Sequence, residues 1–159
     1  MHVTHNSMTI NSRVQSVEIL NKHLAAAIDL HAQVKQAHWN VRGPGFIALH
    51  ALFDRVAADV EVYSDQIAER AGALGGQAEG TVQTAAAKSF LVPYPLGLAA
   101  DHKHIFAVSA ALAAFGDSVR TAIGETSGWG DAATADLFTE ISRGTDTQLW
   151  FVESHGQLE

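Results

Sequence analysis

The sequence of 159 residues contains no cysteine and only three prolines. Without cysteine the chain can form no disulfide, no thiolate metal site and no cysteine nucleophile. The low proline content and the many alanines favour helices. Positive charge is also scarce, because ten Lys and Arg residues stand against seventeen Asp and Glu residues and leave a net charge of −7. This balance argues against a generally basic surface for nucleic acids.

The first eleven residues, MHVTHNSMTIN, contain neither Lys nor Arg and no long apolar run. A secretory signal needs a basic start and an apolar core, so this segment does not resemble one. No later stretch reads as long and apolar enough to span a bilayer. We therefore expect a cytoplasmic protein without a membrane anchor, in which residues 1–11 form a flexible tail. His2 and His5 belong to this tail and are expected to be solvated.

The rest of the chain suits one domain with a sizeable core, and no linker-like segment divides it. Apolar residues recur at helical spacing in four long segments, 12–41, 46–74, 97–124 and 132–153. The long connection between the second and third segments has room for a short helix at 81–88. The sequence therefore predicts an all-α fold. Its four long helices would occupy residues 12–154, and a short C-terminal tail residues 155–159.

Potential metal ligands are concentrated in residues 31–76, on both sides of a Gly-Pro-Gly turn. His50 and Asp54 are four residues apart, so they lie on one helix face about one turn from each other. Asp65 and Glu69 repeat this spacing further along the same helix. Each acid alone would be interpreted as part of a solvated helix face, but their combination with histidines favours a metal site.

The rise of a helix prevents one chain from completing a site with all of these groups. Asp54 and Asp65 are eleven residues apart, which places them on one stripe but about 16 Å apart along the axis. If both pairs act together with His38, two copies of the helix must run antiparallel. The His50/Asp54 end of one copy then faces the Asp65/Glu69 end of the other. A two-fold interface is isologous, so this contact would generate two such sites. The spacing therefore predicts an intersubunit site.

Several motifs in this region resemble the Dps family, the mini-ferritins named for DNA-binding protein from starved cells. They are AHWNVRG before the turn, LHALFD at the start of the following helix, and DQIAER followed by LGG. The resemblance extends over nearly the whole chain, including VPYPL and TADLFTEISRGTDTQLWFVESH. It implies a ferritin-like four-helix bundle, with a short extra helix between the second and third helices that packs into a two-fold contact.

The resemblance also assigns the ligands. It implies that His38, His50 and Asp54 come from one subunit, and Asp65 and Glu69 from its two-fold mate. Carboxylates with one or two imidazoles suit Fe2+ and also admit Mn2+, Zn2+ or Co2+. By this similarity the site would hold iron, with room for two ions. The chain has no paired Glu-x-x-His motif, which distinguishes it from the usual di-iron bundles.

Mini-ferritins oxidise Fe2+, preferably with hydrogen peroxide, and store the ferric product inside a hollow homo-dodecamer. The resemblance therefore implies a ferroxidase that stores iron and protects against oxidative damage. Trp39, next to His38, is expected either to pack or to quench stray oxidising equivalents. In the family, some extra acids face the inner cavity and nucleate the mineral, and relatives often carry Glu at the position of Ala51.

Two further acids, Asp131 and Asp136, lie at the start of the last predicted helix. Mini-ferritins line a three-fold uptake pore with acids at this place, where repeated negative charge attracts Fe2+. The alternative is that these residues cap the helix and complement its dipole. Arg70 and Asp146 match positions that form an intersubunit ion pair in the family.

The remaining histidines have simpler interpretations. His23, His102 and His104 are predicted to lie on the surface. His31 is predicted as a core or interface residue, with an outer-shell or iron-path role as the alternative.

Two other functions stay open. A nucleoid-compacting protein would need Lys and Arg for the phosphates, and the N-terminus has none, so we expect no DNA binding near neutral pH and no nucleoid association. A plain helical bundle used for interaction would form a small oligomer and would load no iron.

Overall fold

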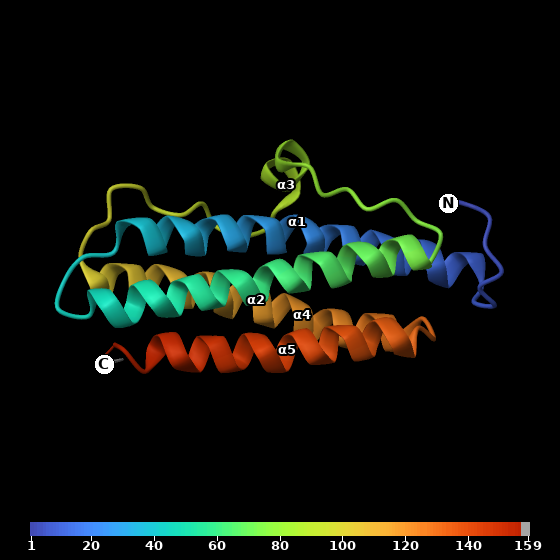
Figure 1. The fold of residues 1–159 in the computed structure, drawn as a ribbon. Coiled ribbons are helices and arrows are strands. Elements are labelled where there is room, and N and C mark those ends of the chain that lie inside the picture. The colour runs from blue at the N-terminus through green and yellow to red at the C-terminus, as the bar shows by residue number, and fades with distance from the viewer. Residues whose placement is uncertain (157–159) are drawn as a thin grey trace.

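The computed structural model describes residues 1–156 and contains five helices (Figure 1). They are α1 (Ile10–Asn40), α2 (Phe46–Ala73), α3 (Val82–Lys88), α4 (Asp101–Gly128) and α5 (Ala132–Glu153). The four long helices lie side by side, and α3 sits outside the bundle against α1. No strand occurs among the described residues. The predicted all-α fold, including the short helix in the long connection, is confirmed.

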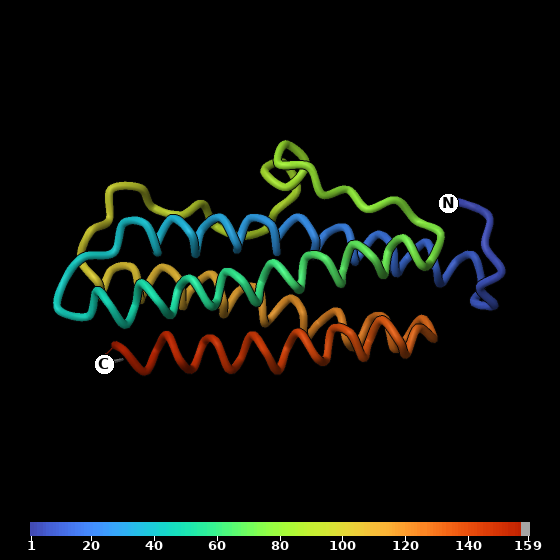
Figure 2. Tube along the Cα trace, viewed as in Figure 1, coloured from blue at the N-terminus to red at the C-terminus, as the bar shows by residue number. Residues whose placement is uncertain are grey.

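The connection between α2 and α4 determines how the helices run. It follows the length of α1 from one end of the bundle to the other and carries α3 about half-way (Figure 2). As a result, α2 and α4 both begin at the end of the bundle where α1 finishes. Four helices with one long crossover are the arrangement of ferritin-like bundles. The start of α2, which carries the predicted histidine site, therefore lies beside the start of α4.

The core is a continuous seam of apolar side chains from all four long helices. Its largest fully buried members include Phe53, Phe115, Phe138, Leu20 and Leu30. These residues recur at helical spacing along their segments, as amphipathic helices in a bundle require. The main packing pairs are α1 with α2 and α4 with α5.

The helix ends differ from the predicted ones where a cap or a distant contact decides them. The α1 helix begins at Ile10, two residues before the predicted segment, and Thr9 caps it, because the Thr9 hydroxyl accepts a hydrogen bond from the Ser12 amide at 3.2 Å. The α4 helix begins at Asp101 rather than at residue 97, since Gly97 has a φ of 85° and the chain stays extended up to Ala100. The last helix begins after Asp131, as predicted.

Two predicted exposures are wrong. His23 and His104 are buried, not on the surface, and each ring binds one polar side chain from another segment, Ser118 for His23 and Tyr94 for His104. The His23 ring contacts the Ser118 hydroxyl at 3.0 Å. By contrast, the large apolar side chains of Ile47 and Trp150 are 75% and 64% exposed in the single subunit.

The other two histidines fit their predictions more closely. His102 is exposed, as predicted. His31 is half-buried on α1, which keeps both of its interpretations open.

The N-terminal segment runs along the far end of the bundle. The backbone amide of His2 donates to the carbonyl oxygen of Gly75 at 2.6 Å, which brings the segment against the end of α2. The His2 and His5 side chains are exposed, as expected. The flexibility of this tail stays a prediction. Of the predicted C-terminal tail, residues 157–159 lie outside the described residues.

One expectation about membranes needs correction. By length and composition, α4 is apolar enough to cross a bilayer, with a mean hydropathy of 1.2 over its most apolar window. Half of that window is buried inside the bundle, where α4 packs against α5 and α1. Its apolar character is therefore that of a core helix in a ferritin-like bundle.

Candidate metal centre

The two predicted histidine ligands lie face to face across the turn between α1 and α2. His38 Nδ1 is 2.7 Å from the backbone oxygen of His50, and His50 Nδ1 is 2.9 Å from the backbone oxygen of His38. The ring centroids are 3.8 Å apart and nearly parallel. Since a carbonyl oxygen can only accept, each Nδ1 must carry the proton. Both Nε2 atoms therefore keep the lone pair that a metal ion needs.

Asp54 lies one turn beyond His50 and completes the half-site of this chain. One of its carboxylate oxygens is 3.9 Å from His38 Nε2 and accepts a hydrogen bond from Lys35 Nζ at 2.6 Å. That hydrogen bond and the charge of Lys35 hold the pKa of Asp54 below its ordinary value. Asp54 is 58% exposed. A carboxylate that is ionised and open to solvent can reach an ion, but a cation must first compete with Lys35.

Asp65 and Glu69 lie further along α2 and are exposed. The helical rise separates Asp54 from Asp65 by about 16 Å, so the acids cannot join the histidines within one subunit. Within residues 1–156 no three His, Asp or Glu side chains, His38, His50 and Asp54 included, form a group that could hold a metal ion in the single subunit. The structure thus brings together His38, His50 and Asp54, and leaves the other two predicted ligands outside this cluster.

Exposed apolar side chains surround the half-site. Trp39 is 67% exposed beside His38, and Phe46 lies 5.1 Å from the His50 ring, centroid to centroid. Ile47 is exposed at the start of α2, and Val62 is exposed further along that helix, about two turns beyond Asp54. Trp39 therefore does not pack in the core of its own subunit. A cavity of about 380 Å³ at the turn is lined by Trp39, Val41, Arg42, Gly43 and Phe46.

The two predicted pore acids, Asp131 and Asp136, differ in how far they are exposed to solvent. Asp131 is buried, and its carboxylate accepts hydrogen bonds from Arg70 Nη2 at 2.7 Å and from the amide of Thr134 at 3.0 Å. Burial alone would raise the pKa of Asp131, but the hydrogen bonds from Thr134 and the charge of Arg70 outweigh it and lower the pKa. Asp131 is thus a helix cap turned into the subunit and does not fit a pore lining. Asp136 is exposed and keeps that possibility.

Arg70 and Asp146, the predicted intersubunit pair, hold other partners within one chain. Arg70 bonds to Asp131, while the Asp146 carboxylate accepts from Arg120 Nη1 at 2.9 Å. The pairing of Arg70 with Asp146 between subunits stays a prediction.

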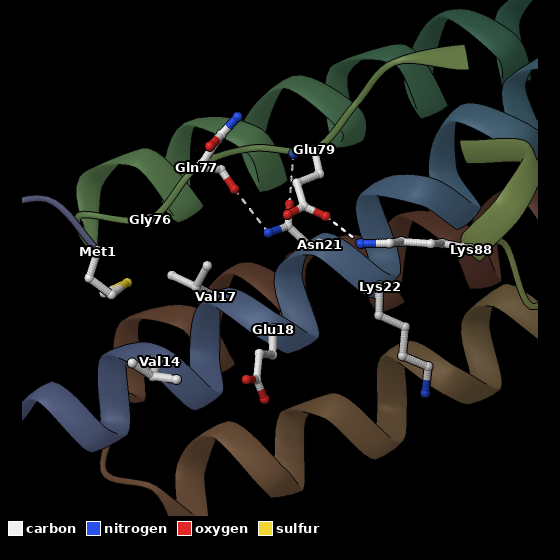
Figure 3. Close-up of a pocket in the computed structure, with 10 residues that line it drawn as sticks. All are labelled: Met1, Val14, Val17, Glu18, Asn21, Lys22, Gly76, Gln77, Glu79 and Lys88. Atoms are coloured by element: carbon white, nitrogen blue, oxygen red, sulfur yellow. Dashed lines mark hydrogen bonds and ion pairs between the residues drawn. The ribbon is translucent and has the colours of Figure 1, made fainter. Parts of the chain in front are cut away.

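A second polar cavity lies far from the histidines, between the first half of α1 and the connection after α2. Its volume is about 460 Å³, and Glu18, Asn21, Lys22 and Glu79 are among the residues that line it (Figure 3). Glu79 forms an ion pair with Lys88 across its rim. Asn21 bonds to the backbone of both Gln77 and Glu79. These polar groups already bind one another and attach the connection to α1.

Comparison with known proteins identifies the family to which the fold belongs. The family description "Ferritin-like domain" matches residues 17–158. The DNA protection during starvation protein of Agrobacterium fabrum is 40% identical over 156 residues, which cover 98% of this chain and 96% of that protein. The chain belongs to the Dps family.

Solved Dps structures share the same fold. DpsA14 from Streptomyces coelicolor superposes with a TM-score of 0.90 at 34% identity, over 96% of this chain and 90% of that one. The Dps of Mycobacterium smegmatis, in its tetragonal form, gives a TM-score of 0.91 at 26% identity, over 96% of this chain and 93% of the other. The resemblance inferred from the motifs is confirmed.

Sequence reasoning missed two residues next to the candidate site, Lys35 and Asp101. Lys35 lies nineteen residues before Asp54 along the chain. It is three residues before His38, a spacing that places it near the same helix face. That spacing was the available signal. Asp101, which contacts the turn at 43–45, gives no local signal, because its partner lies fifty-six residues away.

Proposed function

We propose that this Dps-family protein oxidises Fe2+ at sites shared between two-fold-related subunits and stores the ferric product inside a homo-dodecamer. The observation that carries the proposal is the reciprocal pair of hydrogen bonds between His38 and His50. It leaves the Nε2 atoms of both rings with a free lone pair, and that of His38 lies 3.9 Å from an Asp54 carboxylate oxygen. Three ligands of this kind suit Fe2+, yet they leave coordination positions for a partner's acids and for an oxidant.

Asp65 and Glu69 of the partner subunit are the proposed remaining ligands. Their exposure on α2 leaves them available to another chain, and a two-fold axis would bring each pair to the opposite half-site. The exposed apolar residues Trp39, Phe46, Ile47 and Val62 are the proposed surround of this contact. Burying these side chains between subunits would remove apolar surface from water and so stabilise the contact between the two chains.

The proposed reaction uses hydrogen peroxide as the oxidant. Two Fe2+ ions each give up one electron, peroxide accepts both electrons as its O–O bond breaks, and its oxygens end as water or hydroxide. Hydrolysis of the two Fe3+ ions releases protons and forms the oxyhydroxide mineral. A site with room for two ions would deliver both electrons together, so hydroxyl radical would not be released. Trp39 beside His38 is the proposed trap for stray oxidising equivalents.

Asp136 is the proposed acid at the uptake pore. Asp131 is left out of the proposed pore because it is buried within the subunit. The cytoplasm is the proposed location of the protein. DNA binding at neutral pH is not part of the proposal, because the first eleven residues carry no Lys or Arg and the net charge is −7.

Substitution of two ligands of the half-site tests the proposed function. The variant H50A/D54A should lose peroxide-driven iron oxidation, followed by stopped-flow absorbance of ferric iron, while light scattering still reports the assembled particle. The control H5A/D117A removes one His and one Asp from exposed positions elsewhere and should oxidise iron normally. Undiminished oxidation by H50A/D54A would rule out this site.

A further inference from the structure

The turn between α1 and α2, the helices that carry the predicted ligands, is held by hydrogen bonds to residues at the start of α4. The backbone amide of Arg42 donates to the carbonyl oxygen of Ala99 at 2.8 Å. Three residues later, the amide of Gly45 donates to Asp101 Oδ2 at 3.2 Å. The start of α4 and the turn lie together at one end of the bundle (Figure 1). Residues 99–101 therefore hold the turn at two points.

The Asp101 carboxylate serves two helix starts at once. Its Oδ1 accepts from the amide of His102 at 2.8 Å in the first turn of α4, while its Oδ2 binds Gly45 at the N-cap of α2. Neither helix has a capping side chain at its own N-cap position. A carboxylate at a helix N-terminus satisfies free amides and complements the helix dipole. These hydrogen bonds hold the pKa of Asp101 below its ordinary value, so the group is charged at neutral pH.

The Gly-Pro-Gly turn is shaped to admit this carboxylate. A Cβ atom on Gly43 would lie 2.6 Å from Asp101 Oδ2, and the φ of Gly43 is 135°, which other residues rarely adopt. A Cβ atom on Gly45 would lie 3.4 Å from the same oxygen. The space that the two glycines leave open is thus occupied by a side chain from another helix.

The fastened turn lies directly between the two histidines. His38 is four residues before Arg42, and His50 is five residues after Gly45. Each histidine ring binds the backbone oxygen of the other histidine, so the ring positions depend on how the two helix ends are spaced. A shift of the α2 start would lengthen both bonds together and rotate both Nε2 atoms.

We propose that Asp101 is a positioning residue of the metal centre, which holds the start of α2 so that the rings of His38 and His50 keep the paired arrangement that turns their Nε2 atoms away from the backbone. Asp101 itself does not contact the metal. The proposal rests on the proposed function, because it assumes that these two histidines are ligands. Groups that orient ligands in this way typically change metal affinity by about 10- to 100-fold when removed.

The test measures Co2+ binding to assembled protein by titration calorimetry and by the visible spectrum of the bound ion. We expect D101A to bind Co2+ about ten-fold more weakly than the wild type. D101N keeps one oxygen acceptor and should lie between the two. The matched control is T9A, which removes the cap of α1 about 44 Å from His38 along the same helix. T9A should lose comparable thermal stability while its Co2+ affinity and spectrum stay unchanged.

The outcomes separate the two proposals. If the wild type binds Co2+ and H50A abolishes that binding while D101A leaves affinity and spectrum unchanged, Asp101 is only a helix cap and this inference is overturned. If H50A binds Co2+ as the wild type does, the proposed metal site itself is overturned. Should D101A fail to assemble, D101N decides: weaker binding supports the positioning role, and unchanged binding with an unchanged spectrum contradicts it.

Discussion

The ammonium group of Lys35 lies against the Asp54 carboxylate, at the atoms that the proposed metal ion would bind. Its Nζ atom lies 2.6 Å from the Asp54 carboxylate and 5.8 Å from the centre of the Trp39 ring. An ammonium in this position neutralises the carboxylate in the absence of iron. A metal ion that uses Asp54 must displace it, so Lys35 is expected to weaken binding at this ligand.

Removing the Lys35 charge should therefore strengthen metal binding. In K35M the butyl-like stem is kept and the competitor is lost, and we expect Co2+ to bind about two- to five-fold more tightly, as suits a partly exposed ion pair. Titration calorimetry at low ionic strength measures the change, and high salt should reduce it. The control K22M removes a lysine of α1 that is outside this cluster. Equal affinities for K35M and the wild type would show that Lys35 does not compete.

His23 is a buried titratable group with no part in the proposed reaction. Its ring lies among Phe90, Phe115 and Phe138 and bonds to the Ile19 carbonyl oxygen at 2.8 Å. Burial lowers the pKa of His23 below its ordinary value of 6.5, and this effect outweighs the opposing hydrogen bonds. The folded protein therefore holds His23 neutral at a pH where the unfolded chain already binds a proton.

This difference predicts acid sensitivity. As the pH falls below 6.5, the unfolded state takes up the proton first, so the free energy of unfolding decreases until the folded pKa is reached. The urea midpoint of the wild type should fall between pH 7.5 and pH 5.5. H23Q, which cannot titrate, should be less stable at pH 7.5 but should lose less between the two values. A parallel decline of both proteins would mean that other groups cause the loss.

At the scale of helices, α2 and α5 approach each other closely at Gly144. A Cβ atom there would overlap the Tyr63 hydroxyl oxygen, which accepts a hydrogen bond from Gln148 Nε2 at 3.1 Å. The same Gln148 nitrogen lies 3.1 Å from Asp59 Oδ2. Gly144 thus makes room for a polar contact that joins the two helices.

Substitution at this contact should destabilise the bundle. G144A must displace Tyr63, and we expect a loss of about 1–3 kcal/mol in unfolding free energy. The control G124A is also helical but has no atom within 4 Å of the added Cβ, so it should be neutral or stabilise by about 0.5–1 kcal/mol. Urea unfolding at fixed protein concentration compares them. Adding Y63F to G144A should recover part of the loss, and no recovery would place the strain elsewhere.

Local pattern sufficed for the helices but not for their exact ends. Residues 46–73 and 132–153 show apolar periodicity that a sequence reveals directly, and the structure follows it. The start of α4 was misplaced because residues 99 and 100 form backbone contacts with Arg42, a partner that no local window contains. Burial of His23 and His104 was missed for the same reason, since their partners Ser118 and Tyr94 come from other segments.

The candidate site was likewise predictable from the sequence only in part. The i, i+4 spacing of His50 and Asp54 was sufficient to place them on one face, and the rise of the helix was sufficient to separate them from Asp65. The roles of Lys35 and Asp101 depend on the three-dimensional turn. They became visible only when the ends of α1, α2 and α4 were placed together.

At the scale of the whole molecule, the central claim is that each metal site takes ligands from two chains. Complementation tests it most directly, with two variants that are each inactive as homo-oligomers. H50A/D54A lacks two of the three ligands on the imidazole side of every site, and D65A/E69A lacks the acid side. In a randomly mixed oligomer, about one quarter of the sites would combine an intact imidazole side with an intact acid side from the other variant.

The decisive measurement is the rate of peroxide-driven iron oxidation after the two variants are dissociated and reassembled together in equal amounts. The account predicts recovery of about one quarter of the wild-type rate, whereas each variant reassembled alone stays inactive. Mixed particles that assemble but remain inactive would contradict a site shared between subunits.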